Sequence, residues 1–267
     1  MDPYHYVRLA TIGADRASGN CGHEVLIVGG EDHKTGQSDD AELRYDRLEA
    51  WARERFVGMG DIEERWSGQV METIDGLAYL GRNPLDADNV YIATGDSGMG
   101  MTHGTIAGML ITDLILGREN PWATLYDPSR VTLRAAGRFA KEAANMAWQY
   151  TDWLTPGDIT TPGYLLPGEG AVMRDGLTKV AAYRDDDSVI HRMSAVCPHL
   201  GGIVTWNSSE HTWDCPCHGS RFDRFGTVVC GPAISGLAPL DSDVGDEGPT
   251  EPIDQPSPTA PAGPARV

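Results

Sequence analysis

The sequence predicts a two-part fold, with an α+β N-terminal portion followed by a small all-β antiparallel domain and a disordered tail. Apolar strands alternate with helical segments as far as about residue 128, and short β-like runs separated by turn signals then follow from 158 to 240. The last segment, 241–267, is acidic and proline-rich and has no aromatic residue. Such a composition cannot bury enough surface to offset chain entropy.

The N-terminal portion, residues 1–128, alternates strands, loops and helices. In chain order we expect a buried strand, an acidic loop, an amphipathic helix, a second strand, a glycine-rich loop and a second helix, at 24–28, 31–40, 41–56, 90–94, 95–104 and 105–116. Gly117 stands where the C-terminus of the last helix is expected.

A segment at 129–157 separates the two parts. Its alanine- and charge-rich run predicts one helix from 129 to about 154, which ends before Pro156-Gly157. This helix either connects two domains or packs as the terminal helix of the first, and the two interpretations are compatible. In the β domain, Asp175-Gly176 between two β-like runs is typical of a hairpin.

The net charge of −18 gives a field that repels phosphate backbones and anionic membranes, so we expect neither nucleic acid nor membrane as a partner. The longest apolar stretch, 106–116, is far shorter than the ~20 residues that span a bilayer. The N-terminus lacks the features of a signal peptide. Four of the five cysteines cluster, which favours metal or redox chemistry in a reducing compartment, and hence a cytoplasmic location.

The strongest motif is Cys197-Pro198-His199, followed after 15 residues by Cys215-Pro216-Cys217-His218. Two thiolates can bind one iron and two neutral imidazoles another, and this mixed set lowers the negative charge around a cluster and eases its reduction. Two Cys and two His can also bind one tetrahedral zinc, although zinc fingers pair Cys with Cys and His with His. Four unrelated structural residues are the remaining alternative.

The wider text CPHLGG…CPCHGSRFD…GPA closely resembles the Rieske iron–sulfur domain, over residues of about 160–240. This resemblance implies a [2Fe–2S] cluster clamped between two β-hairpin loops. It also implies that Cys197 and Cys215 bind one iron, whereas His199 and His218 bind the other near solvent.

Residues near the motif can be compared with those of respiratory-type Rieske proteins, and two of them, Gly202 and Phe222, differ. In those proteins a second cysteine pair forms a disulfide between the loops; here Cys217 occupies one position, but Gly202 occupies the other, so the disulfide cannot form. Ser220 can donate a hydrogen bond to a cluster sulfur, whereas Phe222 replaces the tyrosine of high-potential members. Fewer donors stabilise the reduced cluster less, so we predict a low potential.

The segment NVYIATGDSGMGMTHGTIAGMLITDLILG predicts a strand, a glycine loop and a helix, although it does not match G-x-G-x-x-G. With RWSGQVMETIDGLAYLGRNP and PWATLYDPSR, it resembles the C-terminal half of FAD-dependent oxidoreductases of the D-amino-acid-oxidase and glycine-oxidase type. The resemblance implies flavin contacts by a set of loop residues: Gly95, Gly98, Met99, Gly100, Met101 and Thr102. Asp75 and Gly76 are further candidates for flavin contact, and the alternative for Asp75 is a solvated aspartate in a turn. His103 is a candidate to line the flavin site, and His33 reads as a solvated loop residue.

Residues 1–60 contain no strand–GxGxxG–helix to grip the ADP part of FAD. The predicted fold of 1–128 is therefore a partial FAD-oxidoreductase fold, and FAD is a possible cofactor with an incomplete site. We expect the chain to be the C-terminal portion of a flavin–Rieske fusion, and its status as an enzyme stays open.

These observations predict an oxidoreductase in which a flavin takes electrons from an amine- or amino-acid-like small molecule and exchanges them with the cluster. The partner is a flavin domain or a redox partner protein. The alternative is a stand-alone, low-potential, ferredoxin-like Rieske carrier without catalytic activity of its own. A terminal oxygenase is excluded because no histidine follows His218, and a respiratory subunit because no membrane anchor precedes the cluster motif.

Overall fold

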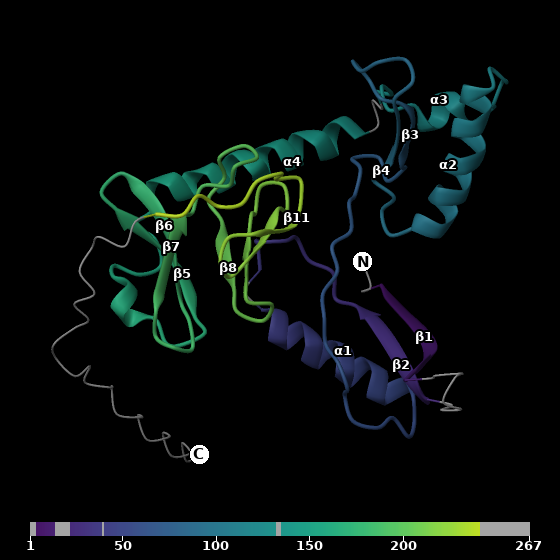
Figure 1. Ribbon diagram of the computed structural model, residues 1–267. Coiled ribbons are helices and arrows are strands. Elements are labelled where there is room, and N and C mark those ends of the chain that lie inside the picture. The colour runs from purple at the N-terminus through teal and green to yellow at the C-terminus, as the bar shows by residue number, and fades with distance from the viewer. Residues whose placement is uncertain (1–3, 14–21, 39, 132–134, 241–267) are drawn as a thin grey trace, which may run out of the picture.

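The computed structural model describes residues 4–13, 22–38, 40–131 and 135–240 (Figure 1). Helices and strands mix in the N-terminal part, and antiparallel sheets make up the C-terminal part, as the sequence predicts. The acidic tail 241–267, predicted to be disordered, and Cys21 lie outside the described residues.

The N-terminal part begins with an antiparallel pair of strands, β1 (His5–Ile12) and β2 (His23–Gly30). β2 and the following helix α1 (Ala41–Arg55) confirm the predicted strand and helix. β1 carries mostly exposed residues, so it lacks the apolar run by which a buried strand is found. His5 stacks on Trp51 with ring centroids 4.1 Å apart, which seats α1 against this ribbon.

A second unit contains the strand pair β3 (Tyr79–Arg82) and β4 (Tyr91–Thr94) and the helices α2 (Gly100–Ile115) and α3 (Ala123–Tyr126). Its small core consists of buried apolar residues: Ala78, Leu80, Ala107, Leu110 and Tyr126. The predicted start of α2 at residue 105 is wrong, because the helix begins at Gly100. Glycines lower helix propensity, but here burial of His103 outweighs that preference.

The connecting segment forms helix α4 (Ala136–Gln149), continued by the 3₁₀ turn η2 (Tyr150–Leu154). The prediction of a single helix from 129 was wrong at its start, because Arg130 lies in a turn and is held there by Asp75. Arg138 near one end of α4 donates to the Ile74 carbonyl at 3.1 Å, and Tyr150 beyond the other end donates to the Leu200 carbonyl at 2.6 Å. The helix α4 thus makes contacts with residues of the N-terminal part near one end and of the C-terminal part beyond the other (Figure 1).

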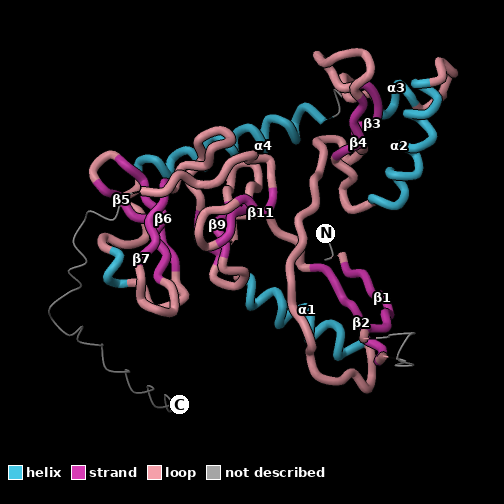
Figure 2. Tube along the Cα trace, in the orientation of Figure 1, coloured by secondary structure: helices cyan, strands magenta, loops and turns pink. Residues whose placement is uncertain are grey.

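The C-terminal part contains two antiparallel sheets (Figure 2). The first joins β5 (Gly170–Asp175), β6 (Thr178–Arg184) and β7 (Ile190–Ser194) after the short 3₁₀ turn η3 (Pro162–Tyr164). The predicted hairpin is confirmed, because Asp175 pairs with Thr178 and Gly176 has a φ of +59°. The second sheet orders its short strands as β11-β10-β9-β8. These strands are β8 (Thr205–Asn207), β9 (Thr212–Asp214), β10 (Arg221–Asp223) and β11 (Val228–Cys230).

A core of large buried side chains joins these sheets, among them Tyr183, Met193, Trp213 and Phe222. The same apolar cluster includes Cys197 and Cys215, so the cysteines of the strongest motif are attached directly to the core. Among the helices that the structure describes, none combines the length and the apolar character needed to cross a membrane.

Candidate metal centre

The first Cys-His loop, residues 197–202, is a tight turn closed by its own backbone. The Cys197 N–H donates to the Gly202 carbonyl at 2.8 Å, and the Gly201 N–H donates back to the Cys197 carbonyl at 2.9 Å. Gly201 closes the turn with a φ of +74°, a conformation that favours glycine. The turn therefore carries both Cys197 and His199.

The second Cys-His loop, residues 215–220, repeats this construction. The Cys215 N–H donates to the Ser220 carbonyl at 2.8 Å, and the Gly219 N–H donates to the Cys215 carbonyl at 2.9 Å. Gly219 has a φ of +78°. Because Gly201 and Gly219 each follow their cysteine by four residues, they occupy equivalent positions in two loops of the same backbone design.

The two loops bring the four motif side chains together as two pairs. The thiols of Cys197 and Cys215 are buried in the same apolar cluster and interact with each other. The imidazoles of His199 and His218 lie perpendicular, with ring centroids 4.9 Å apart. Both Nδ1 atoms are buried and have no hydrogen-bond partner among the described residues. Because an unpaired buried nitrogen costs free energy, this arrangement fits ligation through the two Nδ1 atoms.

The directions of the pKa shifts at Cys197 and His218 favour the forms that bind metals. The hydrogen bond from Cys215 is the main cause that lowers the pKa of Cys197 to about 6, and the Ser220 hydroxyl and the nearby His199 contribute. The same bond, together with burial, raises the pKa of Cys215. Burial lowers the pKa of His218, and this favours the neutral imidazole that binds metals.

The alternative of a single zinc ion receives no support from this geometry. Within the described ranges, no group of three or more His, Cys, Asp or Glu side chains is arranged to hold one metal ion. A thiol pair beside an imidazole pair suits a cluster of two irons better than one tetrahedral ion.

Gly202 and Cys217 face each other across the two loops. A Cβ atom at Gly202 would lie 2.5 Å from the Cys217 Sγ and 3.3 Å from its Cβ. This is the place of the loop-to-loop disulfide that glycine excludes, and Cys217 is a free thiol whose pKa is raised by burial. The Ser220 Oγ accepts from the Ala233 N–H at 3.0 Å, which ties the second loop to residues 231–233. Phe222 is fully buried and offers no hydroxyl.

The residues predicted to contact a flavin are mostly exposed. Gly98 and Gly100 lie at the surface, and the side chains of Met99 and Met101 are 55% and 90% exposed. Thr102 is exposed as well, and Gly100, Met101 and Thr102 belong to the first turn of α2 rather than to a loop.

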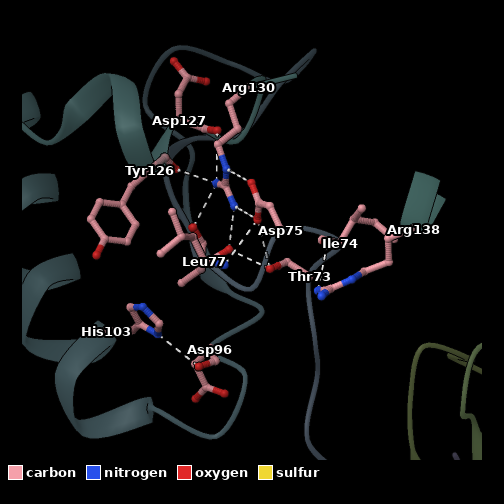
Figure 3. A network of polar contacts seen from close by, with 11 residues as sticks. Thr73, Ile74, Asp75, Leu77, Asp96, His103, Tyr126, Asp127, Arg130 and Arg138 are labelled. Carbon is pink, nitrogen blue, oxygen red and sulfur yellow. Dashed lines mark hydrogen bonds and ion pairs between the residues drawn. The ribbon is translucent and has the colours of Figure 1, made fainter. Parts of the chain in front are cut away.

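Two of the other candidates of this region, Gly95 and His103, contact neighbouring parts of the chain itself. Gly95 is buried, and a Cβ there would lie 2.4 Å from the Thr73 Cγ2, so its close approach is to the chain itself. His103 turns into the core, where its Nδ1 lies 3.0 Å from the Asp96 carbonyl oxygen and its ring meets Tyr126 edge-on (Figure 3). Gly76 and His33 are exposed.

Asp75 is not the solvated turn residue that the sequence suggested. Its carboxylate accepts two hydrogen bonds from Arg130, at 2.7 and 2.8 Å, in an ion pair whose side chains are largely shielded from solvent (Figure 3). The guanidinium also donates to the carbonyls of Leu77 and Ala78 at 2.5 and 2.9 Å. The bonds to Asp75 raise the pKa of Arg130. Sequence reasoning missed Arg130, and the only local signal was its place in the turn Asp127–Arg130.

Two family models match the chain. The model described as "FAD dependent oxidoreductase" matches residues 2–114, and the model described as "Rieske [2Fe-2S] domain" matches residues 161–241. We call these two stretches the FAD-type part and the Rieske part.

Relatives show the same pattern. The chain is 36% identical over 226 residues to a Bacillus subtilis protein described as a Rieske 2Fe-2S iron–sulfur protein, YhfW, an alignment that covers 83% of this chain and 44% of the relative. It is 35% identical to cytochrome b6-f complex iron–sulfur subunit 1 of Cyanophora paradoxa, over 51% of this chain and 53% of the relative. For the cytochrome b6-f complex iron–sulfur subunit of Prochlorococcus marinus the identity is 33%, over 55% of this chain and 77% of the relative. The chain thus spans about half the length of the first two proteins.

Proposed function

The chain belongs to the Rieske family of [2Fe–2S] proteins, and from this premise we propose that it transfers electrons through a cluster held by Cys197 and Cys215 on one iron and by His199 and His218 on the other. One observation carries the assignment of the ligands: two buried, unpartnered imidazole Nδ1 atoms lie beside a buried pair of thiols. The cluster, when bound, supplies one-electron redox chemistry.

The chain's own residues would tune that chemistry. Ser220 provides a hydroxyl to the sulfur of Cys197, which favours the more negative, reduced state. Phe222 provides no second hydroxyl. We therefore propose a low-potential cluster, and a redox titration with a midpoint well above zero would contradict this.

We further propose that the cluster exchanges electrons with a flavin bound by the FAD-type part, during oxidation of an amine- or amino-acid-like substrate. Support comes from the alignment with the Bacillus subtilis protein, because 226 aligned residues of a 267-residue chain must include both parts. The FAD dependent oxidoreductase model over 2–114 points to the same cofactor. A redox partner protein would accept or supply the single electrons, and the cytoplasmic location stays a prediction.

A second candidate is a carrier that works through the Rieske part alone. The match of the Rieske model to residues 161–241 favours it, because that stretch contains all four proposed ligands and a carrier needs only the cluster. The two candidates share the cluster and differ in whether this chain retains a flavin.

The test is anaerobic purification of the full chain, with iron, acid-labile sulfide and flavin counted per chain and an EPR spectrum of the reduced protein. Two irons, two sulfides and a Rieske-type signal would support the cluster. Bound flavin would favour the flavin-linked oxidoreductase, and its absence would favour the carrier. One zinc in place of two irons would overturn the proposal.

A further inference from the structure

Two side chains from outside the Rieske part bind equivalent carbonyls of the two Cys-His loops. The indole Nε1 of Trp153, in η2, donates to the Gly201 carbonyl at 2.9 Å. The amide Nε2 of Gln69, in the FAD-type part, donates to the Gly219 carbonyl at 2.6 Å. Gly201 and Gly219 are the glycines that close the two turns, so each loop is held at the same point by one external donor.

Each loop receives a second external donor. Tyr150 holds the first loop through the Leu200 carbonyl, as described above, and Gln37 of the FAD-type part donates to the Pro216 carbonyl at 2.7 Å. Gln37 is anchored in turn by Asn145 of α4, whose amide donates to it at 3.3 Å. The donors therefore belong to one connected frame rather than to independent surface groups.

The packing at the second loop is close enough to make these contacts specific. A Cβ atom at Gly36, where φ is +69°, would lie 2.9 Å from the Pro216 backbone nitrogen. One at Gly219 would lie 3.3 Å from the Gln69 Nε2. Because a carbonyl oxygen faces Gln69, its NH₂ group must point there, and the same group also reaches the Thr35 Oγ1 at 3.0 Å.

We propose that Gln69 and Trp153, assisted by Gln37 and Tyr150, are positioning residues for the cluster, and that they clamp the two Cys-His loops from outside the Rieske part. The inference rests on the proposed cluster function. The clamp would fix the two loops relative to each other, and with them the angle between His199 and His218. It would act where Gly202 excludes a covalent link between the loops.

This assignment makes the cluster sensitive to the part of the chain that precedes it. Both amide donors to the second loop, Gln37 and Gln69, come from the FAD-type part, and this loop carries the ligands Cys215 and His218. The spectrum and the retention of the cluster should therefore report whether the FAD-type part is docked.

The test uses Gln69→Met in the full chain, because methionine keeps the length of the side chain and loses the donor without adding a charge. We expect the EPR g-values of the reduced cluster to shift, and iron release to a chelator to become about 2- to 10-fold faster, as for loss of one hydrogen bond. Trp153→Phe keeps a ring and removes the equivalent donor, and it should act in the same direction. The double variant should exceed either single one.

Tyr45→Phe is the matched control. The Tyr45 hydroxyl, on α1, donates to Glu210 of the Rieske part at 3.0 Å. The substitution therefore removes one hydrogen bond between the two parts of the chain, away from both Cys-His loops. Its g-values and iron release should equal those of the unmodified chain, and circular dichroism should show all variants folded.

The outcomes separate the two proposals. If Gln69→Met and Trp153→Phe are indistinguishable from Tyr45→Phe while all contain two irons, the clamp is overturned and the cluster function stands. An unmodified chain that binds no two-iron cluster would instead overturn the proposed function and this inference with it.

Discussion

The two regions that the sequence marks as cofactor sites differ in how completely the chain builds them. In the Rieske part, Cys197 and Cys215 are buried in the core, and each loop is closed by its own backbone and held by external donors. Around the glycine loop, Met99 and Met101 face outward, and the inward-facing polar groups bind one another. A metal site needs only a few atoms from two loops, whereas a flavin site needs a wide cradle from several elements. The Rieske part therefore holds all four proposed ligands, although donors from outside it contact their loops.

The largest effect is expected when a proposed cluster ligand in the Rieske part is removed. Cys215→Ser removes a thiolate from the proposed pair, so we expect iron to fall from about two per chain to nearly none and the reduced EPR signal to vanish. Iron analysis and EPR after anaerobic purification measure this. Cys230→Ser, in β11, is the control and should retain the cluster. A Cys215→Ser protein with full iron would disprove the ligand assignment.

The next prediction concerns the other region. Arg130→Met leaves the largely shielded Asp75 carboxylate without its cation and frees the Leu77 and Ala78 carbonyls, so we expect a loss of about 2–4 kcal/mol in the unfolding free energy of the FAD-type part. Urea unfolding followed by circular dichroism measures it, while the EPR spectrum should stay unchanged.

Arg138→Met is the matched control for that experiment. Arg138 is exposed and makes one hydrogen bond to the Ile74 carbonyl, so its loss should cost no more than about 0.5 kcal/mol. Equal losses of unfolding free energy in the two variants would show that the contacts of Arg130 stabilise the fold no more than one exposed hydrogen bond does.

A smaller effect, on the midpoint potential of the cluster, is expected from the loss of the Ser220 hydroxyl. Ser220→Ala removes a hydroxyl that binds the sulfur of Cys197, and loss of about 1 kcal/mol of selective stabilisation of the reduced state lowers a one-electron midpoint by about 40 mV. Redox titration followed by EPR measures the shift. Ser235→Ala, exposed in the following loop, should leave the midpoint in place. A midpoint that rises instead would mean that the hydroxyl does not serve the sulfur.

The smallest effect concerns the junction of the two parts. Burial and the adjacent Glu210 raise the pKa of Tyr45 to about 12. Because the folded state holds this proton more tightly, the contribution to stability is present below pH 10 and is lost as the pH rises toward 12. Thermal unfolding at several pH values should show this loss, and Tyr45→Phe should reduce its slope. Tyr4→Phe, at an exposed position, should not.

Much of the fold was predictable because its signals are local. The apolar run 24–28 and the Asp175-Gly176 turn appear as β2 and as the β5–β6 hairpin. The start of α2 was not predictable, because it depends on burial of His103 against Tyr126, a contact between distant residues. The start of α4 was displaced for a similar reason, since Arg130 is drawn into a turn by Asp75.

The candidate site shows the same division. The spacing of the Cys-His motif is local, so the sequence predicted four residues that the structure brings together as two pairs, and the facing positions Gly202 and Cys217. The donors Gln37, Gln69 and Trp153 were not identified, because glutamine and tryptophan in unpatterned segments carry no signal until the fold places them on a carbonyl. Neither was the structural role of Asp75, whose partner lies 55 positions along the chain.

The four side chains from outside the Rieske part that donate to carbonyls of the two Cys-His loops all precede those loops along the chain, at positions 37, 69, 150 and 153. These four donor residues therefore leave the ribosome before the first proposed ligand, Cys197. Since chains fold from the N-terminus as they are made, the four donor side chains have already been synthesised when the carbonyls of the two loops emerge. The order of synthesis thus suits a cluster that is inserted last, into loops whose shape the earlier chain has prepared.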